Sequence, residues 1–331
     1  MQFPKTWMYI KYFSRIEKKP HGWHFYPLAV LNIFESFIHR KSFRIAHMDL
    51  KRQFRALRYS NQNDLSNFEL PPIELLSVVA GKDIELIPLV VQQAISTSGN
   101  EIVRVTIIVP RRDFESAKNV MSELDLTIEH TVINEEELLS LKIQDRLKSI
   151  FGARYGWVLQ QFLADDYILR SNAAGVLLVN ADTVMLRKMD WLTKDSRQIL
   201  MTSTEYHPPY YLLLNKIMGV PTLPNNTFIT HHMLFQPKVL REIFEHFKIF
   251  DLENLLNKIE LHCDLNDPSP LCVEFEIYAQ GIISIHPELV LYRKFANTTW
   301  PRTKENLKKV KYTIEKSSLL EWNSISLHDY A

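Results

Sequence analysis

The stretch from Gly175 to Arg187, GVLLVNADTVMLR, places polar side chains directly after a buried strand. The almost uniformly apolar run from Val176 to Asn180 is typical of a strand buried on both faces of a mostly parallel sheet. Because side chains alternate along a strand, Asn180 and Asp182 point to the same side of its carboxyl end, where open α/β sheets bind ligands. Two short oxygen-bearing side chains at this spacing suit a hydrated divalent cation, although an ordinary turn uses the same residue types.

Two further clusters carry polar side chains at the ends of predicted strands. Asp83 follows a first apolar run and suits the N-cap of the next helix, which is the commoner role, or a position near the base or ribose of a nucleotide. His231 and His232 end a short predicted strand within NTFITHHMLFQPKVL. Histidine donates to phosphate and binds metals, but a histidine pair without ligand spacing is more often structural.

An acidic stretch near the C-terminal third has a helical pattern. Leu271 to Ile282, LCVEFEIYAQGI, contains Glu274 and Glu276, which either form a solvent-exposed face or contribute to a site. The following run, IISIHPELVLYR, has a strand-like pattern and contains His286.

The elements that would position these residues alternate along the chain from Ile73 onward. Strand, helix and strand follow one another, which implies a parallel sheet with right-handed crossovers. The predicted strands are 73–80, 102–109, 127–133 and 199–203. The predicted helices are 84–95, 112–124 and 144–169, the last with a break near 152–156. An aromatic, proline-containing loop over 206–211 is a candidate acceptor-binding segment.

The composition is that of a soluble globular protein, with 46% hydrophobic and 23% charged residues in a chain of 331. The longest apolar run, 25–34, is too short to span a membrane, and no signal-peptide pattern begins the chain, so we expect a cytoplasmic protein with free cysteines. The motifs GxGxxG, GxxxxGK, GxSxG and HExxH do not occur. Their absence disfavours dinucleotide-binding dehydrogenases, P-loop NTPases, α/β-hydrolases and zincins.

The first 58 residues are basic, with 12 Lys and Arg against 3 Asp and Glu, and they are rich in aromatic side chains. We expect residues 1–70 to form a helical basic N-terminal extension and residues 71–331 to form the main domain. The extension either packs on that domain or binds an anionic membrane surface through residues 1–58, peripherally at the inner face of the membrane. No nucleic-acid partner is expected, because no recognised reading motif accompanies the basic charge.

Four segments, GWVLQQF, LLVNADTVML, FITHHMLF and CVEFEIYAQG, occur in the order and approximate spacing of an uncharacterised bacterial glycosyltransferase-like family. This family resembles the GT-A-type nucleotide-sugar glycosyltransferases, and the resemblance covers about residues 73–300. It implies an α/β, Rossmann-like GT-A fold with a mostly parallel central sheet flanked by helices. It also implies a nucleotide-sugar donor, a glycan or other hydroxyl acceptor, a Mn²⁺ or Mg²⁺ ion, and a role in cell-surface glycan synthesis.

The resemblance also implies roles for individual residues. The Asp-x-Asp motif of GT-A enzymes maps onto Asn180 and Asp182, with Asp182 on the metal and Asn180 nearer the ribose. Glu274 takes the place of a catalytic carboxylate, with Glu276 as the alternative acid, and His286 is the candidate for a late histidine that completes the metal shell. The nucleotide-binding candidates are Asp83, Asn180, Asp182, His231 and His232.

Asparagine in the first acidic place of the motif removes one negative charge. An asparagine still hydrogen-bonds a ribose hydroxyl, but we expect it to weaken metal binding. The departure leaves open a catalytically inactive nucleotide-binding or scaffolding relative. A nucleotidyltransferase is disfavoured, because the chain lacks a Gly-rich phosphate loop after its first strand.

Overall fold

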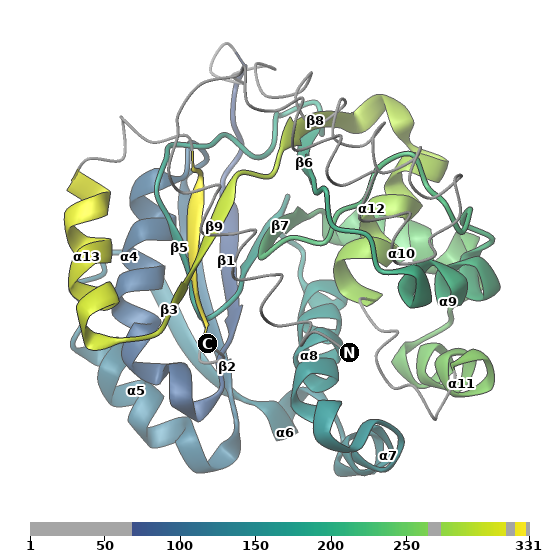
Figure 1. Cartoon of the computed structure of the whole chain (residues 1–331), viewed down its shortest axis with the longest axis horizontal. Helices are drawn as coiled ribbons and strands as arrows, with labels where there is room; N and C mark the ends of the chain where they lie inside the picture. Colours follow the sequence, from purple (N-terminus) through teal and green to yellow (C-terminus); the bar gives the residue numbers. More distant parts are fainter. Residues whose placement is uncertain (1–67, 264–272, 316–321, 329–331) are drawn as a thin grey trace, which may run out of the picture. The chain divides into compact units, whose positions relative to one another are not determined.

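A five-stranded sheet forms the centre of the described chain (Figure 1). The structure is a computed structural model that describes residues 68–263, 273–315 and 322–328. The strands lie in the order β3-β2-β1-β4-β7, and all are parallel except β7, which pairs antiparallel with β4. Their bounds are β1 Ile73–Val78, β2 Ile102–Val109, β3 Glu129–Asn134, β4 Val176–Val179 and β7 His232–Phe235. The predicted α/β class with a mostly parallel central sheet is confirmed.

Helices cover both faces of this sheet, as parallel crossovers require. On one face α4 Ile87–Thr97, α5 Phe114–Ser122 and α13 Lys304–Glu315 pack, and on the other lie α8 Tyr155–Arg170, α9 Pro208–Met218, α10 Pro237–His246 and α12 Val273–Ile285 (Figure 1). The remaining helices are α6 Glu135–Leu138, α7 Leu141–Phe151 and α11 Leu252–His262, with 3₁₀ turns η3 Gly81–Leu86, η4 Arg111–Asp113, η5 Gly152–Arg154 and η6 Pro287–Leu289.

Alternating side chains of the strands divide the core in two. Leu76 and Leu178 belong to the cluster under α8, α10 and α12, whereas their neighbours Leu75 and Leu177 belong to the cluster under α4. The face under α12 is tightly packed, because a Cβ added at Gly281 would lie 2.6 Å from the Ile243 side chain of α10.

Two smaller sheets extend the molecule beyond the carboxyl end of β4. One contains β5 Thr183–Met185, β10 Ser324–His328 and β9 Asn297–Pro301, and the other pairs β6 Gln198–Thr202 with β8 Val290–Lys294. β5 follows β4 after a short turn, and β10 runs antiparallel to it with Ser326 opposite Thr183. This register brings the last residues of β10 back to the end of β4.

Three local predictions are wrong. The segment 206–211 is not a loop throughout, because Pro208 and Pro209 occupy the first turn of α9, where proline needs no backbone donor. The histidine pair does not end a strand: β7 begins at His232 and runs away from the pair. His286 does not lie in a strand, since α12 continues to Ile285 and β8 begins only at Val290.

The other predicted strands and helices occur within a few residues of their expected bounds, including the helix break at η5 between α7 and α8. The basic segment 1–58, with its membrane prediction, lies outside the described residues. Within the described ranges, no helix has both the length and the apolar character needed to cross a membrane.

Candidate functional site

Polar side chains from three strands meet at the carboxyl end of β4. The strand-end cluster contains Asn180, Asp182, His231 and His328. The Nδ1 atom of His328 lies 3.0 Å from Oδ2 of Asp182, and Nδ2 of Asn180 lies 3.4 Å from Nδ1 of His231. The two imidazole rings are 5.4 Å apart between centroids. Asn180 and Asp182 therefore both contribute to one cluster, but they lie in the turn between β4 and β5 rather than on one side of a strand.

Backbone hydrogen bonds fix this arrangement. The amide of Asn180 donates to the His231 carbonyl at 3.0 Å, because β7 pairs antiparallel with the end of β4. The amide of Leu327 donates to the Asp182 carbonyl at 2.8 Å and holds the end of β10 against the same turn. Each cluster residue is thus positioned by a strand end rather than by a free loop.

The charges in the cluster depend on one another. Burial alone would raise the pKa of Asp182, but the hydrogen bond and charge of His328, together with the charge of His231, lower it below its ordinary value. Burial lowers the pKa of His231 to about 4 in spite of the attraction of Asp182. Asp182 is therefore ionised and His231 neutral at pH 7, so the cluster offers one carboxylate and at least one unprotonated ring nitrogen.

The second residue of the histidine pair has a different environment. His232 is fully buried, its ring contacts Trp191 edge to face, and burial lowers its pKa to about 3. Its Nε2 atom lies 3.4 Å from the Ser324 hydroxyl of β10. The pair is thus split, with His231 in the strand-end cluster and His232 in the core.

Asp83 lies at the end of β1 and does not cap a helix. The turn η3 has Ala80 at its N-cap position, with no side-chain cap, so the N-cap interpretation of Asp83 is wrong. Its carboxylate instead pairs with Arg302, which also donates to Glu85 at 3.0 Å. Burial raises the pKa of Asp83, and the charge of Asp182 adds to this effect. Asp83 therefore lies within electrostatic reach of the strand-end cluster.

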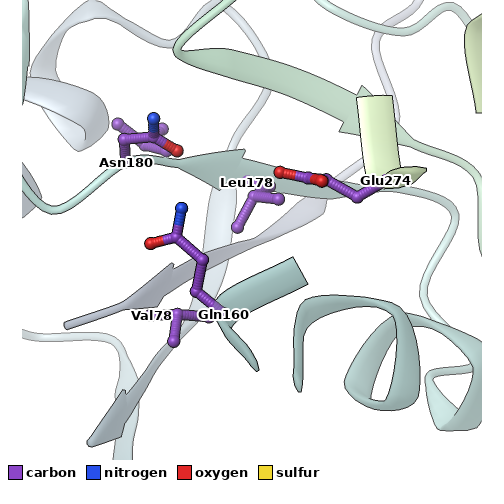
Figure 2. Close-up of a pocket in the computed structure, with 6 residues that line it drawn as sticks. Val78, Gln160, Leu178, Asn180 and Glu274 are labelled. Atoms are coloured by element: carbon purple, nitrogen blue, oxygen red, sulfur yellow. The ribbon is translucent and has the colours of Figure 1, made fainter. Parts of the chain in front are cut away.

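A small cavity connects the cluster to α12. It has a volume of about 10 Å³, enough for roughly one water molecule, and its polar lining comes from Gln160, Asn180 and Glu274. Figure 2 shows the Glu274 carboxyl group pointing across Leu178 toward Asn180 and Gln160. Burial, and next the charge of Asp165, raise the pKa of Glu274 well above its ordinary value.

Glu276, two residues further along α12, does not line the cavity, and hydrogen bonds to neighbouring segments hold its carboxylate. Its carboxylate accepts hydrogen bonds from the Tyr211 hydroxyl at 2.7 Å, the Phe228 amide at 2.6 Å and the Gln280 side chain at 3.0 Å. These bonds tie α12 to α9 and to the segment before β7. Of the two candidate acids, only Glu274 lines the cavity beside Asn180.

His286 is not brought to Asp182. Its Nε2 atom lies 2.9 Å from Glu242 and its Nδ1 atom 3.4 Å from Glu288, and it lines a separate cavity of about 480 Å³ beside the N-terminal side of β4. The reason is the length of α12, whose 13 residues extend about 20 Å. Glu274 lies at the start of this helix and His286 directly after its end, so the two side chains lie far apart.

The histidine beside Asp182 is instead His328, which the sequence analysis missed. Its signal is the alternation in SISLH, which places Ser324, Ser326 and His328 on one face of a short strand. Arg302 was also missed, and nothing in its local sequence marks it, because its partner Asp83 is 219 residues away.

The donor chemistry of Asp182 and His328 fits a divalent cation with two protein ligands. A carboxylate oxygen and an imidazole nitrogen 3.0 Å apart can enter one coordination shell, and ions such as Mg²⁺ take their remaining ligands from water and substrate phosphates. Within the described ranges, no group of three His, Cys, Asp or Glu side chains is placed to hold an ion. The protein would therefore supply a small part of the shell.

No family model and no curated protein matches the sequence. Among solved structures, the chain is similar to mouse xyloside xylosyltransferase 1 in its apo form, with 10% identity, a TM-score of 0.45, and coverage of 78% of this chain and 98% of that one. It is also similar to an active-site mutant of LgtC and to the galactosyltransferase LgtC in complex with donor and acceptor sugar analogues. In each case the identity is 12%, the TM-score 0.41, and the coverage 78% of this chain and 88% of that chain.

Proposed function

We propose that this protein is a glycosyltransferase that moves a sugar from a nucleotide-diphosphate donor to an acceptor hydroxyl. The observation that carries the proposal is the strand-end cluster, in which Asp182 and His328 lie 3.0 Å apart beside Asn180. A carboxylate and an imidazole at the carboxyl end of a parallel strand suit a diphosphate and its cation. The resemblance of the motifs around Asn180 and Glu274 to GT-A enzymes supports the same chemistry.

In this proposal Asp182 and His328 would hold a Mn²⁺ or Mg²⁺ ion, and the donor diphosphate would bind beside them. The ion, when bound, supplies Lewis-acid neutralisation of the leaving diphosphate. The side-chain amide of Asn180 binds a ribose hydroxyl. The neutral imidazole of His231 forms a hydrogen bond with the nucleotide sugar, either as hydrogen-bond donor or as acceptor. Asp83, held by Arg302, lies toward the nucleoside end.

Glu274 is the proposed general base. It takes the proton of the acceptor hydroxyl while the acceptor oxygen bonds to the anomeric carbon, and the bond from that carbon to the diphosphate oxygen breaks. Such a group contributes about 10²- to 10⁴-fold to the rate. This role belongs to a reaction that inverts the anomeric centre, so a product of retained configuration would contradict it.

Ligand-induced stabilisation tests the donor assignment. The full chain is screened by thermal unfolding against UDP-, GDP-, CMP- and dTDP-sugars, each with and without Mn²⁺. A donor at 100-fold its Kd adds about 2.7 kcal/mol of stability, and we expect this for one nucleotide class and only with the ion. Asp182→Asn should remove the ion dependence, whereas the exposed Asp145→Asn on α7 should keep it.

Transfer of the sugar is then measured with the donor found in the screen. Stabilisation by a nucleotide sugar without any transfer to acceptors would identify a catalytically inactive nucleotide-binding relative. No stabilisation by any donor would contradict the proposed function.

A further inference from the structure

The guanidinium group of Arg302 is buried against the turn that follows β1. Its side chain is 7% exposed, and it pairs with the carboxylate of Asp83, whose side chain is 10% exposed. It also donates to the Lys82 carbonyl and, at 3.0 Å, to the Glu85 carboxylate. All three acceptors belong to η3, so one side chain fixes this turn at three points.

The main chain of Arg302 is bound to a different strand end. Arg302 directly follows β9, which pairs parallel with β10 and places Pro301 opposite His328. The backbone amide of Arg302 donates to the His328 carbonyl at 2.9 Å. The His328 imidazole in turn lies 3.0 Å from Oδ2 of Asp182. A continuous path of hydrogen bonds and covalent bonds therefore runs from Asp83 through Arg302 to the strand-end cluster.

A buried ion pair such as that of Arg302 and Asp83 adds little to the stability of a fold. Taking two charges out of water costs free energy that offsets much of their attraction, and an apolar pair of similar volume is often as stable. The contact with Glu85 also adds little, because that carboxylate is 67% exposed. An arginine does, however, present its donors in a rigid planar fork that fixes the direction of its partners. The contacts therefore point to orientation, rather than stability, as the contribution of Arg302.

We propose that Arg302 is a positioning residue that holds the nucleoside side and the cation side of the donor site in one arrangement. It holds the nucleoside side through Asp83 and the cation side through His328. The proposal rests on the proposed function, which assigns ligands to these two residues. Arg302 acts on both ligands through other residues, because its guanidinium group is occupied by the acceptors of η3.

Loss of the guanidinium fork should weaken two separate binding events. Arg302→Gln releases η3 from the segment that supports the end of β10, so neither strand end keeps its place. Removal of a group that orients a ligating residue typically costs about 10- to 100-fold in affinity, and we expect this for a nucleotide and for Mn²⁺ alike. Asp83→Asn keeps an oxygen for Arg302 and should weaken only the nucleotide. Asp182→Asn should weaken only Mn²⁺.

Hydrogen exchange of the ligand-free full chain tests the connection without any ligand. The backbone amides of Asp83 and Leu327 each donate to a backbone carbonyl, and each reports on one of the two strand ends. Both amides should exchange faster in Arg302→Gln than in the wild type. Arg302→Lys keeps the charge but not the fork, so it should also speed both, and it supplies the test if Arg302→Gln does not fold.

The matched control is Arg104→Gln on β2. Arg104 pairs with Glu74 and Glu129, each at 3.0 Å, toward the amino ends of the strands and away from the strand-end cluster. Its loss removes an ion-paired guanidinium from the same sheet and so reports any general loss of stability. Exchange at Asp83 and Leu327 should stay as in the wild type.

Titration calorimetry of the same variants measures the two ligands separately. Mn²⁺ is titrated without nucleotide, and UMP, GMP, CMP and dTMP are titrated in the presence of EDTA. Arg302→Gln should bind both Mn²⁺ and the preferred monophosphate about 10- to 100-fold more weakly, and Arg302→Lys should lie closer to Arg302→Gln than to the wild type. Arg104→Gln should bind both as the wild type does.

Unchanged exchange at both strand ends in the Arg302 variants, or unchanged affinities, would overturn the positioning role and keep the proposed function. Equal losses of affinity in Arg104→Gln would also overturn it, because they would follow from lowered stability alone. Faster exchange in the Arg302 variants of a protein that binds neither Mn²⁺ nor any nucleotide would contradict the proposed function and keep the connection between the strand ends.

Discussion

Asn180 belongs to the strand-end cluster and also lines the small cavity with Glu274, and the carboxyl groups of Asp182 and Glu274 have opposite environments. Asp182 has His328 at 3.0 Å and a pKa below its ordinary value, although burial alone would raise it. The pKa of Glu274 lies well above its ordinary value, because burial and next the charge of Asp165 raise it by more than a backbone hydrogen bond lowers it. The first group is therefore an anion at neutral pH, and the second is a proton carrier.

This difference shows that the neighbours of a buried carboxyl group, rather than burial alone, determine its protonation and its role. Glu276 provides a third case on the same helix as Glu274. It is fully buried, yet three donors satisfy it, and its hydrogen bonds connect α12 to neighbouring segments. The three environments correspond to ligand binding, proton transfer and structural support.

The largest expected effect is on the rate of sugar transfer. Glu274→Gln removes the proposed base but keeps the shape of the side chain, so kcat should fall by about 10²- to 10⁴-fold while the donor Kd stays unchanged. Steady-state kinetics and donor titration check this. If Glu276→Gln lowers kcat per folded molecule and Glu274→Gln does not, the roles of the two acids are reversed.

The pH dependence of stability should come next in size. The ordinary pKa of Asp165 is 3.8 and its folded value is about 8, so the folded state binds the proton more tightly within this window, and stability falls as pH rises through it. Asp165→Asn should flatten this decline by several kcal/mol, measured by urea unfolding from pH 5 to 8. Asp145→Asn should keep the wild-type slope, and parallel curves for all three proteins would contradict the prediction.

The third effect should be on stability alone. Glu276→Gln can keep one oxygen facing the Tyr211 hydroxyl and the Phe228 amide, but it removes the charge and places an amide N–H against the Gln280 side chain, which is a donor in the wild type. The unfolding free energy should fall by about 1–3 kcal/mol. Tyr211→Phe removes one donor without introducing a new one and should cost less. An unchanged denaturation midpoint in Glu276→Gln would mean that this carboxylate is not required to hold α12.

The sequence predicts the central sheet well, because a buried parallel strand is nearly continuous in apolar residues. The strand predicted over 102–109 and the helix break at 152–156 both occur. The failures are at segments whose structure depends on distant partners. Pro208 begins a helix rather than a loop, and the histidine pair precedes a strand whose direction is set by antiparallel pairing with β4.

The site could be predicted where it depends on local geometry. Asn180 and Asp182 do contribute to one cluster, although the turn after β4, rather than the alternation of strand side chains, brings them together. His328 could not be assigned in this way, since its relation to the site comes from the pairing of β10 with β5. Spacing along a chain does not encode such contacts.

The smallest predicted effect concerns Asn180, which lies between the two regions. Its Nδ2 atom is 3.4 Å from the neutral ring of His231, and it lines the cavity with Glu274. Asn180→Asp adds a second carboxylate to the cluster that contains Asp182, so Mn²⁺ should bind about tenfold more tightly, which corresponds to about 1.4 kcal/mol.

Calorimetric titration of the full chain with Mn²⁺ measures this change. The matched control is Asn172→Asp, which adds the same charge at an exposed position before the other end of β4 and should leave Mn²⁺ affinity unchanged. Equal tightening in both variants would reflect net charge rather than a ligand. An affinity that stays the same in Asn180→Asp would mean that this side chain belongs with the cavity of Glu274 rather than with the cation site of Asp182.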